Sequence, residues 1–160
     1  MLAVRLRLLL ACLWAGSLWA VAYLVAPTLF ATLHDNTLAG AMVGSLLRSV
    51  AWLSIACALV LLVLVWRAVD LDAAQRRGLI RLISAMLLCC LVIYLGIQPA
   101  MANLRDAAGP GGLKGSPLAA RFGMLHGVSQ LVYLVESVLA GCLVVKAVPG
   151  RTPERVSGVS

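Results

Sequence analysis

The sequence predicts an all-α fold, a transmembrane bundle of four helices. Of the 160 residues, 62% are apolar and only 12% are charged, whereas soluble domains carry about a quarter charged residues. Four stretches with few or no charges are long enough to cross a hydrocarbon core about 30 Å thick, which needs roughly 20 helical residues. No strand-like alternation is present, and backbone groups in lipid must pair within their own segment, so each stretch is expected to be a helix.

The first predicted helix covers about residues 8–30, within the uncharged stretch that follows Arg7. Pro27 lies near its end. Because proline lacks a backbone N–H and disfavours helical geometry in the residue before it, the helix is expected to kink or end there. A cleaved signal peptide is the alternative, since two arginines precede an apolar run that reaches small residues near Ala20. The apolar sequence continues well beyond that point, which favours a membrane helix.

The second predicted helix covers about residues 40–66, and the third covers about residues 80–99. Trp66 is expected to anchor the second helix at the membrane boundary. The turn between these two helices is short and charged. Pro99 is expected to end the third helix, and a loop rich in glycine and proline follows it.

The fourth predicted helix covers about residues 121–146, so the membrane domain is expected to span residues 1–148. Residues 149–160 are polar and have no apolar face, and we expect them to form a disordered cytoplasmic tail. No internal repeat of useful length is evident in the sequence.

Positive charge predicts the orientation of the chain. Nine of the thirteen Lys and Arg residues lie at the N-terminus, between the second and third helices, or in the C-terminal tail. By the positive-inside rule, both termini are expected to face the cytoplasm, in a multi-pass protein of the cytoplasmic (inner) membrane. The net charge of +7 is spread over loops and tails, so nucleic acid is not an expected partner.

The common catalytic signatures are absent from the sequence, among them the nucleophile elbow, the phosphate-binding loop and the His-Glu-x-x-His pair. Enzymatic activity is therefore not expected, and no cofactor is expected. The five cysteines all lie inside predicted spans, where they behave as small apolar residues, so no disulfide framework is expected.

The fourth helix carries the predicted functional site. At 100° per residue, one side of this helix gathers polar side chains, and we predict that they line a polar pocket: His126, Ser129, Gln130, Tyr133 and Glu136. Glu136 is the leading residue, because an ionised carboxylate near the bilayer middle costs on the order of a few kcal/mol unless it is paired, hydrated or protonated. It is expected either to be protonated and hydrogen-bonded to a group such as Tyr94 or Ser54, or to lie in a water-accessible pocket.

Helix packing is the alternative interpretation of this face. Gly123 and Gly127 form a small-xxx-small motif, and polar side chains often hydrogen-bond between membrane helices. A metal or haem site is a further alternative, because the only two histidines, His34 and His126, are both expected near the outer side.

Three stretches, taken together, resemble the transmembrane-protein-205-like family, which in bacteria is a four-helix membrane domain of unknown function (domain of unknown function 4149). They are Leu13–Trp19 with Val25–Phe30, Gln98–Pro99 with Leu104–Arg105, and Arg121–Ser129. The resemblance covers most of the chain and implies a four-helix membrane protein without an assigned reaction, with eukaryotic relatives associated with platinum-drug resistance and secretory traffic. His126 and Pro27 match the family best, whereas Tyr133 stands in a region where members often have Asn.

Two roles follow from these observations. The first is a binding or transport-associated membrane component that uses the polar pocket on the fourth helix. The second is a structural or assembly subunit that packs against a larger membrane complex, with a basic residue of the partner opposite Glu136. The expected partners are the lipid bilayer and, as candidates, another membrane protein or a second copy of the chain.

Overall fold

A computed structural model describes residues 2–109, 112–113 and 115–148 of the chain. The tail predicted at residues 149–160 lies outside the described residues. Four helices are long and apolar enough to cross a membrane, Leu2–Thr32, Asn36–Trp66, Ala73–Ala107 and Ala119–Ala147, and the described part of the chain contains no strand. The all-α class and the four spans predicted from the sequence are confirmed.

Two of the spans are composite, and two are single α-helices. The first span consists of α1 (Leu2–Trp19), the π-helical segment η1 (Ala20–Val25) and α2 (Ala26–Thr32). The third span repeats this order with α4 (Ala73–Leu91), η2 (Val92–Ile97) and α5 (Gln98–Ala107). The second and fourth spans are α3 (Asn36–Trp66) and α6 (Ala119–Ala147).

The π-helical segments explain why proline does not end either composite span. Pro27 and Pro99 lie in the first turn of α2 and α5. Just before each proline, a backbone N–H donates to the carbonyl five residues back, from Ala26 to Val21 and from Gln98 to Ile93. This wider turn accommodates the proline ring, which in a regular helix would clash with the carbonyl four residues earlier. The sequence places the end of the third helix at Pro99, but the helix continues to Ala107.

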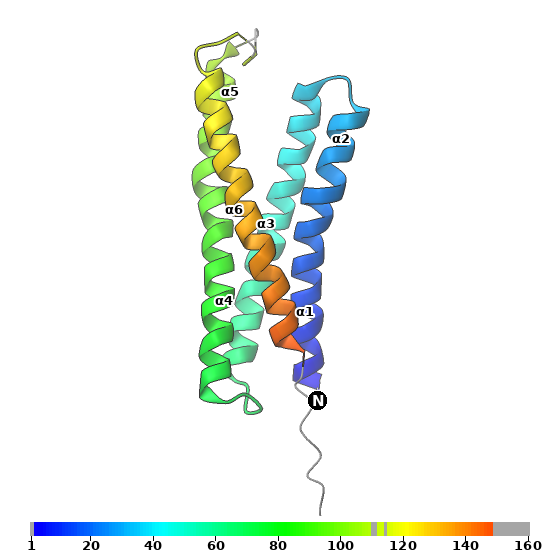
Figure 1. The fold of residues 1–160 in the computed structure, drawn as a ribbon, viewed down its shortest axis with the longest axis vertical. Helices are drawn as coiled ribbons and strands as arrows, with labels where there is room; N and C mark the ends of the chain where they lie inside the picture. Colours follow the sequence, from blue (N-terminus) through cyan, green and yellow to red (C-terminus); the bar gives the residue numbers. More distant parts are fainter. Residues whose placement is uncertain (1, 110–111, 114, 149–160) are drawn as a thin grey trace, which may run out of the picture.

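The composite spans also give the two halves of the chain the same order of elements, although no repeat is evident in the sequence. Each half of the chain begins with a long helix that contains a six-residue π-helical segment followed by a proline. A connection then leads to a single long α-helix. The two interrupted helices run in the same direction through the bundle (Figure 1). The halves are residues 2–66 and 73–147.

The core lies in the half of the bundle that contains the N-terminus, which we call the proximal half (Figure 1). There α1 packs against α3 and α6, and α4 packs against the same two helices. Large buried side chains fill the centre: Trp14, Leu18, Leu61, Ile83, Met86 and Leu143. At the proximal end, the buried Arg7 pairs with Asp70 in the turn between α3 and α4. The hydrogen bond from this guanidinium holds the pKa of Asp70 below its usual value.

At the other end of the bundle, the distal end, the helices separate into two arms (Figure 1). The first arm is α2 with the distal half of α3, and the second arm is α5 with the distal half of α6. α2 packs against α3, and α5 packs against α6. Asp35 begins α3 by accepting hydrogen bonds from the backbone N–H groups of Thr37 and Leu38. The divergence of the arms positions the candidate site.

Candidate functional site

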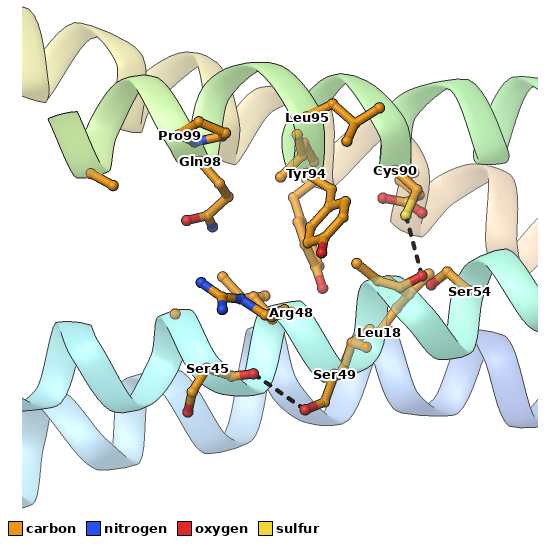
Figure 2. A pocket seen from close by; sticks show the side chains of 18 of the residues that line it. Leu18, Ser45, Arg48, Ser49, Ser54, Cys90, Tyr94, Leu95, Gln98 and Pro99 are labelled. Carbon is orange, nitrogen blue, oxygen red and sulfur yellow. Dashed lines mark hydrogen bonds between the residues drawn. The ribbon is translucent and has the colours of Figure 1, made fainter.

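A cavity of about 900 Å³ lies between α3 on one side and α4, η2 and α5 on the other. Its proximal floor consists of buried residues from all four spans, including Leu18, Ser54, Cys90 and Glu136. Toward the distal end its walls become exposed and polar, with Ser45, Arg48, Asn103 and Arg105 at the mouth. Figure 2 shows the two walls facing each other, with Ser45, Arg48, Ser49 and Ser54 on α3 and Cys90 to Pro99 opposite.

Glu136 is the most deeply placed ionisable group of this cavity. It lies ten residues before Lys146, about 15 Å along α6 at 1.5 Å per residue, which is half the thickness of a hydrocarbon core. Its side chain is 1% exposed, and its Oε1 atom has no hydrogen-bond partner. A carboxyl group therefore lies near the middle of the membrane span with an acceptor atom unused.

Two other polar atoms of the lining are buried and unpaired in the same way, namely Ser54 Oγ and Tyr133 Oη. Tyr133 and Glu136 are three residues apart on α6 and so share one face of the helix, while Ser54 comes from α3. The remaining buried atoms without partners in the described residues lie outside the cavity lining: Arg7 Nη1, Trp14 Nε1 and Arg76 Nε. Half of the buried unpaired polar atoms of the described residues thus line this one cavity, and they come from two different helices.

The neighbouring residue Ser137 shows how α6 divides its polar side chains. The Tyr23 hydroxyl donates to Ser137 Oγ over 3.0 Å, and the Trp19 indole N–H donates to the Ser137 carbonyl over 3.3 Å. A Cβ atom at Gly141 would lie 3.7 Å from the Trp19 ring, so a small residue one turn later leaves room for the indole. Ser137 is therefore paired with the first span, whereas Glu136 lines the cavity.

The walls of the cavity make few contacts with each other. At the floor, Cys90 Sγ donates a weak hydrogen bond to the Ala51 carbonyl, 3.8 Å away, which is drawn as a dashed line in Figure 2. Nearer the middle, the rings of Trp52 and Tyr94 meet edge to face with 5.9 Å between their centroids. Farther out, Arg48 extends from α3 toward Gln98 across open space (Figure 2).

Of the five residues predicted to form a polar pocket, Tyr133 and Glu136 line this cavity. Ser129 is buried, His126 and Gln130 are exposed, and none of these three belongs to the lining. The His126 ring stacks on Phe122, with 6.4 Å between centroids, and Arg105 lies over the same Phe122 ring. The predicted face is divided because α6 packs against α1 and α4 proximally and against α5 distally.

Arg48 and Gln98 line the cavity, but they were not among the pocket residues predicted from the sequence. A signal for Arg48 was available, because it is the only charged residue in α3. A lone charge inside a membrane span commonly faces a cavity or another helix. No comparable signal marks Gln98, which precedes the proline of α5.

Gly123 and Gly127 do not pack against another helix of this chain. Both are exposed, and a Cβ atom built at either position would meet no atom within 4 Å. Among the described residues, the small-xxx-small motif is therefore not used within the bundle, because the distal half of α6 packs against η2 and α5 on another side.

The two histidines belong to different arms. His34 is exposed in the turn between α2 and α3, and His126 is exposed on α6. Within the part of the chain that the structure describes, no group of three or more His, Cys, Asp and Glu side chains could hold a metal ion.

Comparison with known protein families gives one match. A family model described as "Domain of unknown function (DUF4149)" matches residues 9–110, which is more than half of the chain. The matched segment includes both π-helical segments and both walls of the cavity, but it ends before α6 and Glu136. Comparisons with curated proteins and with solved structures find no match.

Proposed function

The chain belongs to the DUF4149 family of domains of unknown function, and we propose that it binds a small organic molecule in the cavity between its two arms. One observation carries the proposal: Ser54 Oγ, Tyr133 Oη and Glu136 Oε1 are buried without partners at the cavity floor. Each such atom costs about 1–3 kcal/mol when it is left unpaired. A bound molecule that hydrogen-bonds with them recovers this free energy on binding.

The size and lining of the cavity support an organic ligand rather than a bare ion. Sites for small molecules typically enclose about 300–1,000 Å³ and are mostly apolar, with a few placed polar groups. The present cavity, at about 900 Å³, falls in this range, and its walls include Leu18, Val50, Ile93 and Leu95. A single ion would occupy only a small part of such a space.

We propose that the cavity opens to the outer side of the cytoplasmic membrane. This orientation is supported by the segments that gather at the proximal end, namely the start of α1, the turn between α3 and α4 with the first half of α4, and the end of α6. These segments hold most of the basic residues of the chain, and basic loops favour the cytoplasm. The distal mouth then faces the exterior.

The proposed role is binding or transport-associated rather than catalytic, since the sequence contains none of the common catalytic signatures. The floor lies at mid-depth, and the buried core around Trp14, Leu61 and Ile83 closes the bundle beneath it. In this conformation a ligand that enters from the distal side is held at the floor.

Thiol labelling tests whether the cavity is open to water on the outer side. In a chain whose five cysteines are replaced by alanine, Ser49→Cys places one thiol in the cavity wall. The matched control is Val128→Cys, which is exposed outside the cavity. Val128 lies eighteen residues before Lys146, and Ser49 lies eighteen residues before Arg67, so the two thiols are at similar depth along their helices. A membrane-impermeant maleimide added to intact cells should modify only the cavity thiol. Equal reactivity of the two thiols contradicts an open cavity, and reaction only in inverted vesicles contradicts the orientation.

Native mass spectrometry of the full chain, gently extracted from its own membrane, tests occupancy. We expect a stoichiometric small-molecule adduct that is lost in Glu136→Gln and retained in Asp106→Asn, a carboxyl variant outside the cavity lining. An adduct that persists in Glu136→Gln, or a chain that is empty in every preparation, contradicts the proposal.

A second candidate role, as an assembly subunit, is favoured by the exposed and open Gly123 and Gly127. Small residues on a membrane helix allow close approach of a second helix. Under this role, Gly127→Leu abolishes co-purification with a partner or a second copy and leaves the labelling of the cavity thiol unchanged. We also propose that the family relationship extends to the transmembrane-protein-205-like proteins, on the three stretches of resemblance described above.

A further inference from the structure

The charges of the cavity are separated along its length and do not pair with each other. Arg48 and Arg105 line the mouth, and Glu136 lies at the floor. Among the described residues the single ion pair is that of Arg7 with Asp70, at the proximal end of the bundle. Arg48 and the carboxyl group are therefore available to a ligand, whereas the Arg105 guanidinium lies over the Phe122 ring.

The distance between the two poles follows from helix geometry. Ser54, which lines the cavity floor as Glu136 does, lies six residues after Arg48 on α3, about 9 Å along the axis. Arg105 lies seven residues beyond Gln98 on α5, about two turns farther out. A ligand that reaches both poles must therefore be elongated by about 9 Å or more.

The wall between the poles is largely apolar. Val50, Ile93 and Leu95 all line the cavity. Val50 lies between Arg48 and Ser54 along α3, and the other two lie between Cys90 at the floor and Gln98, toward which Arg48 extends. A charged or strongly hydrated middle section would leave polar groups unpaired against these side chains. An aliphatic or aromatic middle section instead buries apolar surface there.

Resting on the proposed binding function, we propose that the ligand is a bipolar molecule: an anionic group binds at Arg48, an apolar segment follows the walls, and a protonated amine reaches Glu136. Arginine forms bidentate hydrogen bonds with carboxylates and phosphates. An ammonium group supplies donors to the Glu136 carboxylate and to the oxygens of Ser54 and Tyr133. In a phospholipid headgroup the phosphate and the amine are too close together to reach both poles, although a lipid phosphate alone can bind at Arg48.

Protection of the cavity thiol from maleimide measures binding with defined probes. Aminooctanoate carries both charged groups on a chain of suitable length, aminobutanoate is too short, and octanoate and octylamine each carry one group. The protein is the full chain with the single thiol of Ser49→Cys, in phosphatidylcholine nanodiscs. We expect aminooctanoate to protect at concentrations about tenfold or more below those of the other three probes, as one charge-assisted contact contributes about that factor.

Two substitutions assign the poles to residues. Arg48→Gln should raise the protecting concentration of aminooctanoate to that of octylamine without changing octylamine itself. Glu136→Gln should raise the protecting concentration of aminooctanoate to that of octanoate, and the protecting concentration of octanoate itself should not change. Arg121→Gln and Asp106→Asn remove charges outside the cavity lining and should change nothing. Nanodiscs that contain phosphatidylglycerol test competition by a lipid phosphate. This phosphate should compete with aminooctanoate only in the chain that retains Arg48.

The outcomes separate this inference from the proposed function. Equal protection by aminooctanoate and octylamine, with both dependent on Glu136, contradicts a bipolar ligand and leaves binding at the floor intact. Equal weakening of every probe by both substitutions also contradicts the assignment of the poles. A thiol that no probe protects contradicts both the bipolar ligand and the proposed function.

Discussion

Replacing Glu136 by methionine is expected to stabilise the folded bundle while it removes ligand binding. The carboxyl is 1% exposed, and its Oε1 atom has no partner, so the folded state carries the cost of one unpaired acceptor, about 1–3 kcal/mol. Methionine has a similar length, no strongly polar atom and a flexible chain that adapts to irregular space. We therefore expect an increase of about 1–2 kcal/mol in the free energy of unfolding.

The adjacent residue provides a matched control of opposite sign. Ser137 is also buried, at 7% exposure, but its hydroxyl accepts a hydrogen bond from Tyr23 over 3.0 Å. Ser137→Ala removes this bond, which in membrane proteins contributes on average about 0.6 kcal/mol. Two neighbouring buried polar residues on one helix should thus change stability in opposite directions.

Reversible unfolding in mixed micelles, followed by far-UV circular dichroism over increasing mole fractions of a denaturing detergent, measures both variants. If Glu136→Met lowers the free energy of unfolding by about 1 kcal/mol or more, the carboxyl is well paired in the folded protein. The description of the cavity floor as a set of unused polar atoms is then wrong, and the proposed function loses its main support.

Three further perturbations test other parts of the structure. The hydrogen bond from Arg7 lowers the pKa of Asp70, so this pair contributes stability above the unfolded pKa, and that contribution is lost as pH falls below about 4. Asp70→Asn should therefore lower the free energy of unfolding by about 1 kcal/mol at neutral pH. Unfolding measured across pH should also show that this part of the acid dependence is gone. A Cβ atom at Gly141 would lie 3.7 Å from the Trp19 indole, so Gly141→Leu should displace this ring and lower the free energy of unfolding by about 1–3 kcal/mol. Gly123→Leu, at an open position, should be neutral. Equal losses for the two variants in detergent unfolding would contradict the packing described. Asp35→Ala removes the acceptor for two backbone N–H groups at the start of α3 and should lower the thermal unfolding midpoint by an amount equivalent to about 1 kcal/mol. An unchanged midpoint would contradict the capping role of Asp35.

The positions of the spans were predictable because the bilayer constrains them so strongly. A segment of about 20 apolar residues in lipid must pair its own backbone groups, and the helix is the form that does so within one segment. The two prolines were harder to interpret, because local preference alone makes Pro99 a helix end. Whether a helix continues past proline depends on a wider turn just before it. No sequence pattern predicts such a turn in Val92–Ile97 or in Ala20–Val25.

The candidate site was only partly predictable for a related reason. The depth of Glu136 and the cost of a carboxyl there follow from its position between the charged ends of α6. The polar side of α6 looks continuous in the sequence, yet its residues face different neighbours. Ser137 is hydrogen-bonded to Tyr23 in η1, Glu136 lines the cavity, and His126 stacks on Phe122.

The sequence by itself determined that this chain is four membrane helices with one costly carboxyl at mid-depth, because hydropathy and charge spacing act within a single segment. Only the tertiary structure decided that Glu136, Ser54 and Arg48 line one cavity. That placement depends on how each helix is rotated about its axis and on the divergence of the two arms. Both result from the packing of helices against one another, and no periodicity within a single helix specifies them.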